Sequence, residues 1–221
     1  MIQHMHRQVD KVKKMILSLG SMVEERVRMS SQAIESIDAE IAEKVIRTDY
    51  EIDEMEVKIE EECLKLLALY QPVAVDLRFI IAVIKINNEL ERIGDYAVNI
   101  ARRIKKISKQ DICDFQFDYS VMAEKTQYML NQSLNALVNL ELETAFKVLS
   151  MDDEVDAIKK NAYAQIKQAM RQYPENLEYL INLFLISGNL ERLADHTTNI
   201  AEEVIYLIEG EIIRHNNKQI S

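Results

Sequence analysis

The stretch LERIGDYAVNIA, which runs from Leu90 to Ala101, decides the fold because the chain contains it twice. It returns as LERLADHTTNIA from Leu190 to Ala201, with seven of the twelve positions identical at a constant offset of 100 residues. In both copies Glu, Asp and Asn stand four residues apart, so a helix places them one turn apart along one side. The repeat therefore predicts two similar helical units in tandem.

The composition around the repeat is typical of long helices. Of the 221 residues 48% are hydrophobic, whereas only 4 are Gly and 2 are Pro. A sheet fold would need more turn-forming residues than this chain contains. Apolar side chains recur every three or four positions, which predicts six long helices. The expected helices span residues 5–37, 39–69, 72–108, 119–140, 142–172 and 174–209.

The third helix of each unit is expected to begin at a proline, Pro72 or Pro174, because the first turn of a helix leaves its N–H groups unpaired in any case. Asp38 is the expected N-cap of the second helix, and a bend is expected at Gly20. We therefore predict an all-α fold of two tandem, pseudo-symmetric three-helix bundles. The expected parts are a first bundle at 1–108, a linker at 109–118, a second bundle at 119–210 and a C-terminal tail at 211–221.

The net charge indicates which classes of partner are unsuitable, and the cysteines indicate the cellular compartment. A net charge of −10 argues against nucleic acid as a partner, because phosphate backbones are bound by clustered Lys and Arg. No apolar run approaches the ~20 residues that span a bilayer, and the N-terminus lacks the apolar core of a signal peptide. Cys63 and Cys113 have no disulfide-framework spacing. We therefore expect a cytoplasmic protein with reduced thiols.

Pairs of acids one turn apart form the candidate functional site. Each repeat carries such a pair at the edge of its apolar face, and the preceding helix carries another at a matching height, because neighbouring helices of a bundle run antiparallel. Four carboxylates from two helices suit hard cations such as Mg²⁺, Ca²⁺, Mn²⁺ or iron. The candidate ligands are Asp49, Asp53, Glu91 and Asp95 in the first unit and Asp152, Asp156, Glu191 and Asp195 in the second.

A plainer interpretation of these acids is a solvated helix face. Arg92 or Arg192 would then pair with them in surface ion pairs that contribute little. The occurrence of the same acid pairs on the same two helices in both units favours metal binding. Asn99 and Asn199 either support the carboxylates as hydrogen-bond donors or bond to a neighbouring helix.

The sequence offers little sign of catalysis. It contains no Gly-rich phosphate loop, and no Ser-His-Asp or Cys-His arrangement can be singled out. A carboxylate-bridged di-metal oxidase or ferroxidase is an alternative, but helical enzymes of that class use Glu-x-x-His pairs, and the sequence has none. A third alternative is a structural scaffold whose acids are merely solvated. We expect that the protein is not an enzyme.

Four stretches, in and around the repeat, carry a resemblance to a known family. The PhoU proteins are resembled, in the order in which that family has them, by QPVAVDLR from Gln71 to Arg78, LERIGDYA from Leu90 to Ala97, NLERLADH from Asn189 to His196 and NIAEEVIYL from Asn199 to Leu207. The resemblance spans nearly the whole chain. Ala194 replaces the usual Gly of the motif, and Gly188 stands where the family often has Arg, so neither departure affects an acid.

This resemblance implies a cytoplasmic accessory of the high-affinity phosphate transport system. Such proteins restrain phosphate uptake and help to switch off the phosphate-starvation response. The implied partners are the ATPase subunit of the phosphate ABC transporter, the sensor histidine kinase and a second copy of the chain, with the membrane reached only through partners. The family's paired acids bind metal clusters, which implies iron, manganese, magnesium or zinc at the eight carboxylates named above.

Overall fold

The structure, a computed structural model, describes residues 2–110 and 113–211, and helices make up nearly all of this part. Within it there is no strand, which confirms the all-α prediction. Two of the predicted linker residues and almost all of the predicted tail lie outside the described residues. The helices are α1 (Ile2–Ser36), α2 (Ala39–Arg47), α3 (Tyr50–Tyr70), α4 (Ala74–Ile107), α5 (Ser120–Asn139), α6 (Leu142–Gln172), the 3₁₀ turn η1 (Pro174–Asn176) and α7 (Leu177–Glu209).

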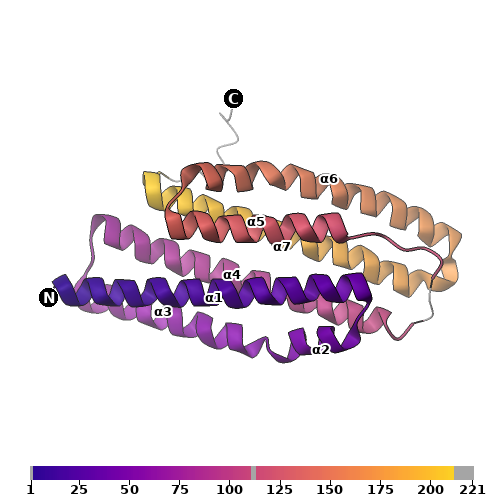
Figure 1. The fold of residues 1–221 in the computed structure, drawn as a ribbon, viewed down its shortest axis with the longest axis horizontal. Coiled ribbons are helices and arrows are strands. Elements are labelled where there is room, and N and C mark those ends of the chain that lie inside the picture. Colours follow the sequence, from indigo (N-terminus) through magenta and orange to yellow (C-terminus); the bar gives the residue numbers. More distant parts are fainter. Residues whose placement is uncertain (1, 111–112, 212–221) are drawn as a thin grey trace.

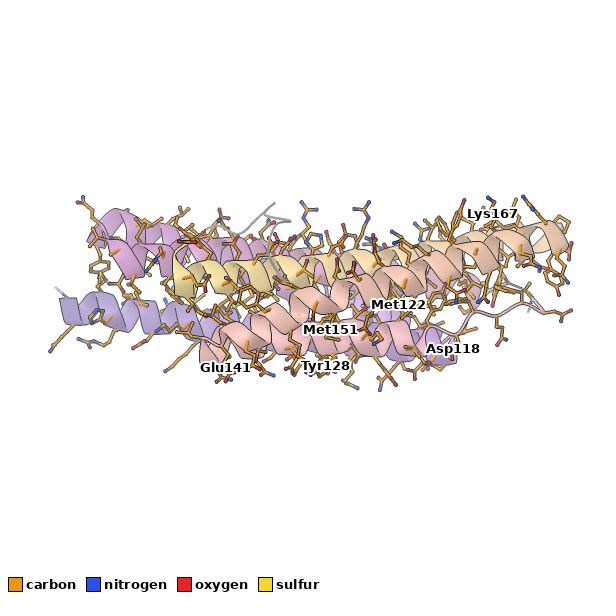
Figure 2. All side chains as sticks on the ribbon, turned by 90° about the horizontal axis from the view of Figure 1, so that it is seen from above. Asp118, Met122, Tyr128, Glu141, Met151 and Lys167 are labelled. Carbon is orange, nitrogen blue, oxygen red and sulfur yellow. The ribbon has the colours of Figure 1, made fainter. Side chains whose placement is uncertain are left out.

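The helices form two elongated layers that lie one on the other (Figure 1). Helices α1 to α4 make one layer and α5 to α7 the other, and α4 and α7 lie against each other between them. Figure 2 shows the antiparallel course of the second layer: α5 runs from near Asp118 to near Glu141, and α6 returns past Lys167 at the Asp118 end. The rings of Tyr96 and His196 lie 5.3 Å apart between centroids, so the two copies of the repeated stretch meet where α4 packs on α7.

One continuous core joins the two layers. The apolar period of α1 buries Val12, Leu19 and Val23, each with no exposed surface. The repeat helices are buried more extensively, since α4 is covered by three other helices of its own layer as well as by α7. Buried in both copies of the repeat are Leu90, Ile93, Ala97, Ile100 and Ala101, and Leu190, Leu193, Ile200 and Ala201.

The helix predicted over residues 39–69 is interrupted, so that prediction was wrong in one respect. Helix α2 ends at Arg47 and α3 begins at Tyr50, with Thr48 and Asp49 between them. The side chain of Arg26 on α1 donates to the Thr48 carbonyl at 3.4 Å and also pairs with Glu51. A carbonyl drawn toward a neighbouring helix is a poor acceptor for the next turn, which accounts for the break.

The helix ends follow the expected chemistry except at Pro72. Asp38 caps α2, and its carboxylate accepts from the Glu40 and Ile41 amides at 2.8 and 3.0 Å. Pro174 begins η1 as expected, but Pro72 lies ahead of α4, which begins at Ala74. The residue before a proline disfavours the helical conformation, and Gln71 is left-handed, with φ 46°.

Gly20 lies inside an unbroken α1, where the sequence had predicted a bend. A Cβ atom at this position would lie 2.9 Å from Leu134 Cδ2 on α5. The missing side chain therefore lets α1 approach α5, a contact between the two layers. Gly20 therefore serves the packing of α1 on α5.

Truncation of a buried side chain in the repeat should destabilise the whole molecule. Ile93 has no exposed surface, and Ile93→Ala should lower the free energy of unfolding by about 2–5 kcal/mol, through lost apolar burial and the cavity left behind. Urea denaturation measures this loss. Val57→Ala, at a side chain that is 51% exposed, is the control and should change stability by less than about 0.5 kcal/mol. Equal effects of the two substitutions would contradict the proposed core.

Candidate metal centres

Helices α3 and α4 bring the first four predicted acids within reach of one another's charge. Asp49 is half-buried at the α2–α3 break, and Asp53 is exposed one turn further along. Burial raises the pKa of Asp49, and the charges of Asp53 and Asp95 raise it further, whereas Arg102 and Arg26 lower it. The acid pairs of the two helices therefore lie opposite each other, as the antiparallel arrangement predicts.

Glu91 has a similar environment on α4. Its pKa is raised first by burial and then by Asp95, one turn away on the same helix. Arg92 lowers the pKa, and its Nε lies 3.7 Å from Glu91 Oε2 in a mostly exposed ion pair. Asp53 and Glu56 of α3 raise it further. Glu56 is a fifth acid of this cluster that the sequence prediction missed, although it stands only three residues after Asp53.

The second cluster lies between α6 and α7 and has the larger pKa perturbation. Burial, followed by the charges of Asp195 and Asp156, raises the pKa of Asp152 to about 6. The pKa of Asp195 is also raised, by burial and then by Glu191 and Asp156, and it is lowered by His196 and Lys159. Like charges in a partly dry setting oppose ionisation, so these groups hold protons more tightly than free carboxyls do.

The two clusters differ at one position. Glu56 follows Asp53 by three residues, and Lys159 follows Asp156 by three, so a cation stands in the second cluster where the first has an acid. Lys159 Nζ lies 2.6 Å from Glu191 Oε1, and the more exposed Lys160 lies 3.7 Å from Asp156. At this position the second cluster therefore carries a positive charge where the first carries a negative one.

The donor chemistry suits a hard cation, but the side chains are not arranged around one. Among residues 2–110 and 113–211, no group of three or more His, Cys, Asp or Glu is placed to hold a metal ion. All eight predicted ligands are carboxylates, the donors preferred by oxygen-seeking metals. Closure around a metal would therefore need side-chain rotations, which half-exposed acids on helix surfaces can make.

The two asparagines bond away from the carboxylate clusters. Asn199 Nδ2 on α7 donates to Glu89 Oε2 on α4 at 3.0 Å, while Asn99 Oδ1 accepts from Arg102 at 3.1 Å. His196 Nδ1 lies 2.6 Å from the same Glu89 oxygen. Asn199 thus bonds to a neighbouring helix, one of the two roles predicted for it. Glu89, which the sequence prediction missed, joins the two layers near the centre of the molecule.

These helices and acids define a class, that of all-α proteins built from two tandem helical bundles with duplicated acid pairs. The PhoU domain matches the chain twice, at residues 16–104 and 119–204. The chain belongs to the PhoU family. In the part of the chain that the structure describes, no helix is both long and apolar enough to cross a membrane.

Relatives and solved structures agree with this assignment. The chain is 36% identical over 203 residues, covering 91% of it and 93% of the relative, to the "Phosphate-specific transport system accessory protein PhoU homolog" of Clostridium acetobutylicum. A relative from Pseudomonas aeruginosa with the same description is 33% identical to the chain, over 96% of this chain and 88% of the relative.

Two crystal structures share the fold. That of PhoU from Pseudomonas aeruginosa matches with a TM-score of 0.90 at 32% identity, over 93% of this chain and 99% of the other. The phosphate transport system regulatory protein PhoU from Streptococcus pneumoniae matches with a TM-score of 0.82 at 28% identity, over 94% and 98%.

The raised pKa of Asp152 predicts how stability depends on pH in chelator-treated protein. Because the folded pKa lies above the unfolded value of 3.8, the native state binds more protons between these values, and stability should fall as the pH rises from ~4 to ~6. Asp152→Asn should remove part of this fall and add about 1 kcal/mol above pH 6, after allowance for solvent screening.

Urea denaturation at pH 4.5, 5.5 and 7.5 measures the effect. Asp10→Asn, at an exposed aspartate of α1 that is remote in sequence from this cluster, is the matched control and should leave the pH slope unchanged. A wild-type slope that persists fully in Asp152→Asn would show that this carboxyl is not perturbed.

Proposed function

We propose that this protein regulates phosphate uptake as an accessory of a phosphate-specific transport system and has no chemistry of its own. The observation that carries the proposal is the match of the PhoU domain over both halves of the chain, together with relatives that are named as accessory proteins of that system. Negative regulation of the phosphate-starvation response follows as the corresponding output. The protein acts in the cytoplasm and reaches the membrane only through its partners.

The proposed partners are large proteins, because long rigid helices offer extended surfaces rather than a catalytic cleft. We infer that the chain acts as an adaptor between the ATPase subunit of the phosphate ABC transporter and a sensor histidine kinase, and that it forms a homodimer. The elongated form of the two layers supports this role (Figure 1). Two partners can then be held on one molecule at separate faces.

The proposed metal sites are the two carboxylate clusters, with iron, manganese, magnesium or zinc as the bound ion. A bound cation would supply the positive charge that offsets repulsion among the acids. Asp49 and Asp53 on α3 and Glu91 and Asp95 on α4 would hold it in the first layer. Asp152 and Asp156 on α6 and Glu191 and Asp195 on α7 would do so in the second. Since each cluster draws on two helices, occupation would fix one helix against the other.

Loss of the α4 acids tests the metal proposal. Glu91→Ala with Asp95→Ala should lower the metal content of purified protein by about half, because one of two clusters loses its α4 ligands, and should de-repress the phosphate-starvation genes in cells. Elemental analysis measures the metal. Glu60→Ala with Glu61→Ala, at exposed acids of α3, is the charge-matched control and should retain the full content. Unchanged metal in the α4 variant would favour a structural scaffold with solvated acids.

Lys159 should weaken cation binding to the second cluster, because it already pairs with Glu191. In the background of Glu91→Ala with Asp95→Ala, Lys159→Met should tighten Mn²⁺ binding by about two- to fivefold, the range expected for a partly exposed ion pair. Isothermal titration calorimetry measures the affinity. Lys167→Met, at an exposed lysine further along α6, should have no effect. Weaker binding in Lys159→Met would assign the lysine a supporting role instead.

A further inference from the structure

A basic pocket lies at the C-terminal end of α4 and contains none of the eight predicted ligands. Its cavity of about 410 Å³ is lined by Ile46, Asn99 and five cationic side chains. A neighbouring hollow on α2 shares Lys105 and has a mixed lining of two lysines, one arginine and two glutamates among other residues. So many cations in one place are unexpected in a chain with a net charge of −10. The five cations of the pocket are Arg102, Arg103, Lys105, Lys106 and Lys109.

The two arginines of the pocket differ in how their hydrogen-bond donors are paired. Arg102 is held by its bond to Asn99, at 3.1 Å. The Nε of Arg103 is buried and has no hydrogen-bond partner among the described residues. A buried donor without an acceptor is costly, by about 1–3 kcal/mol, and native proteins normally supply a partner for it. Arg103 thus lines the pocket with a guanidinium group that the described residues leave partly unsatisfied.

The internal repeat shows that the fold does not require this basic cluster. At the offset of 100 residues, the five positions correspond to Glu202, Glu203, Ile205, Tyr206 and Glu209, none of which is basic. Stabilisation of the helix dipole by cations in the last turn is likewise not required, because α7 has no basic residue there. The repeat kept its acid pairs in both halves but has the basic cluster in only one.

We propose that this pocket binds a phosphate-bearing anion. Guanidinium groups match the geometry of phosphate oxygens and bond to them in pairs, and lysines add charge around them. Lys105 is partly engaged by Glu43, which leaves two arginines and two exposed lysines to meet the ligand. The volume fits a small ligand of one or a few phosphate groups. Arg102 also lowers the pKa of Asp49, so the proposal is tested on protein from which metal has been removed.

The test is calorimetric titration of sodium pyrophosphate into the full chain, freed of metal by chelation, at low ionic strength. Arg102→Gln with Arg103→Gln should weaken binding by about tenfold or more, because two bidentate donors are lost. Lys58→Gln with Lys65→Gln removes the same charge from exposed side chains of α3 and should leave the affinity within about twofold. Should the arginine variant fail to fold, Lys106→Gln with Lys109→Gln, at exposed side chains, takes its place with the same expected loss.

A second arm distinguishes a soluble anion from a lipid headgroup. Vesicles of phosphatidylcholine with and without phosphatidylglycerol are sedimented with each protein. Pyrophosphate binding that is lost in the pocket variant supports a soluble ligand. Binding only to the phosphatidylglycerol vesicles, lost in the same variant, supports a headgroup. The proposal is overturned if neither probe binds, or if the pocket variant and the control bind equally well.

Discussion

The packing of α4 on α7 is the contact on which the rest of the molecule depends. Every other helix of the described residues packs directly on one of these two. The buried rows of the repeat fill the space between them, and Lys85–Glu203 and Glu89–His196 cross the same seam at 3.1 and 2.6 Å. With their apolar rows turned inward, both repeat helices carry their acids at the border of the buried face. The carboxylate clusters therefore form at the outer border of each repeat helix, where α4 meets α3 and where α7 meets α6.

The sequence predicted the positions of the helices well, but it predicted the contacts between helices only in part. The period of apolar residues located the long helices because burial on one side is a property of each helix alone. The break at Thr48 escaped prediction because it depends on Arg26, a side chain from another helix. Glu89 escaped for the same reason, since its partners His196 and Asn199 belong to the other layer. Contacts between helices depend on which helix faces pack together, and the periodicity of apolar residues within one helix does not reveal its partner.

The candidate sites show the same limit. The acid pairs were predicted from spacing and repetition, and the structure brings the two helices of each pair together. Glu56 and Lys159 were missed, although the constant separation between Asp53 and Asp156 also relates these two positions. A comparison of the two halves residue by residue, rather than motif by motif, would have found both. It would also have revealed the cations of α4 that α7 replaces by acidic and apolar side chains.

The break between α2 and α3 makes the two halves mechanically unequal. Asp49 stands at the junction of two helices, where its carbonyl accepts from the Ile52 amide at 2.9 Å, whereas Asp152 stands within the unbroken α6. Displacing Asp152 by an ångström strains helical hydrogen bonds on both sides of it. Displacing Asp49 needs only a readjustment of backbone dihedrals at a junction that is already irregular. The predicted metal ligands of the first half can therefore shift more easily than those of the second half.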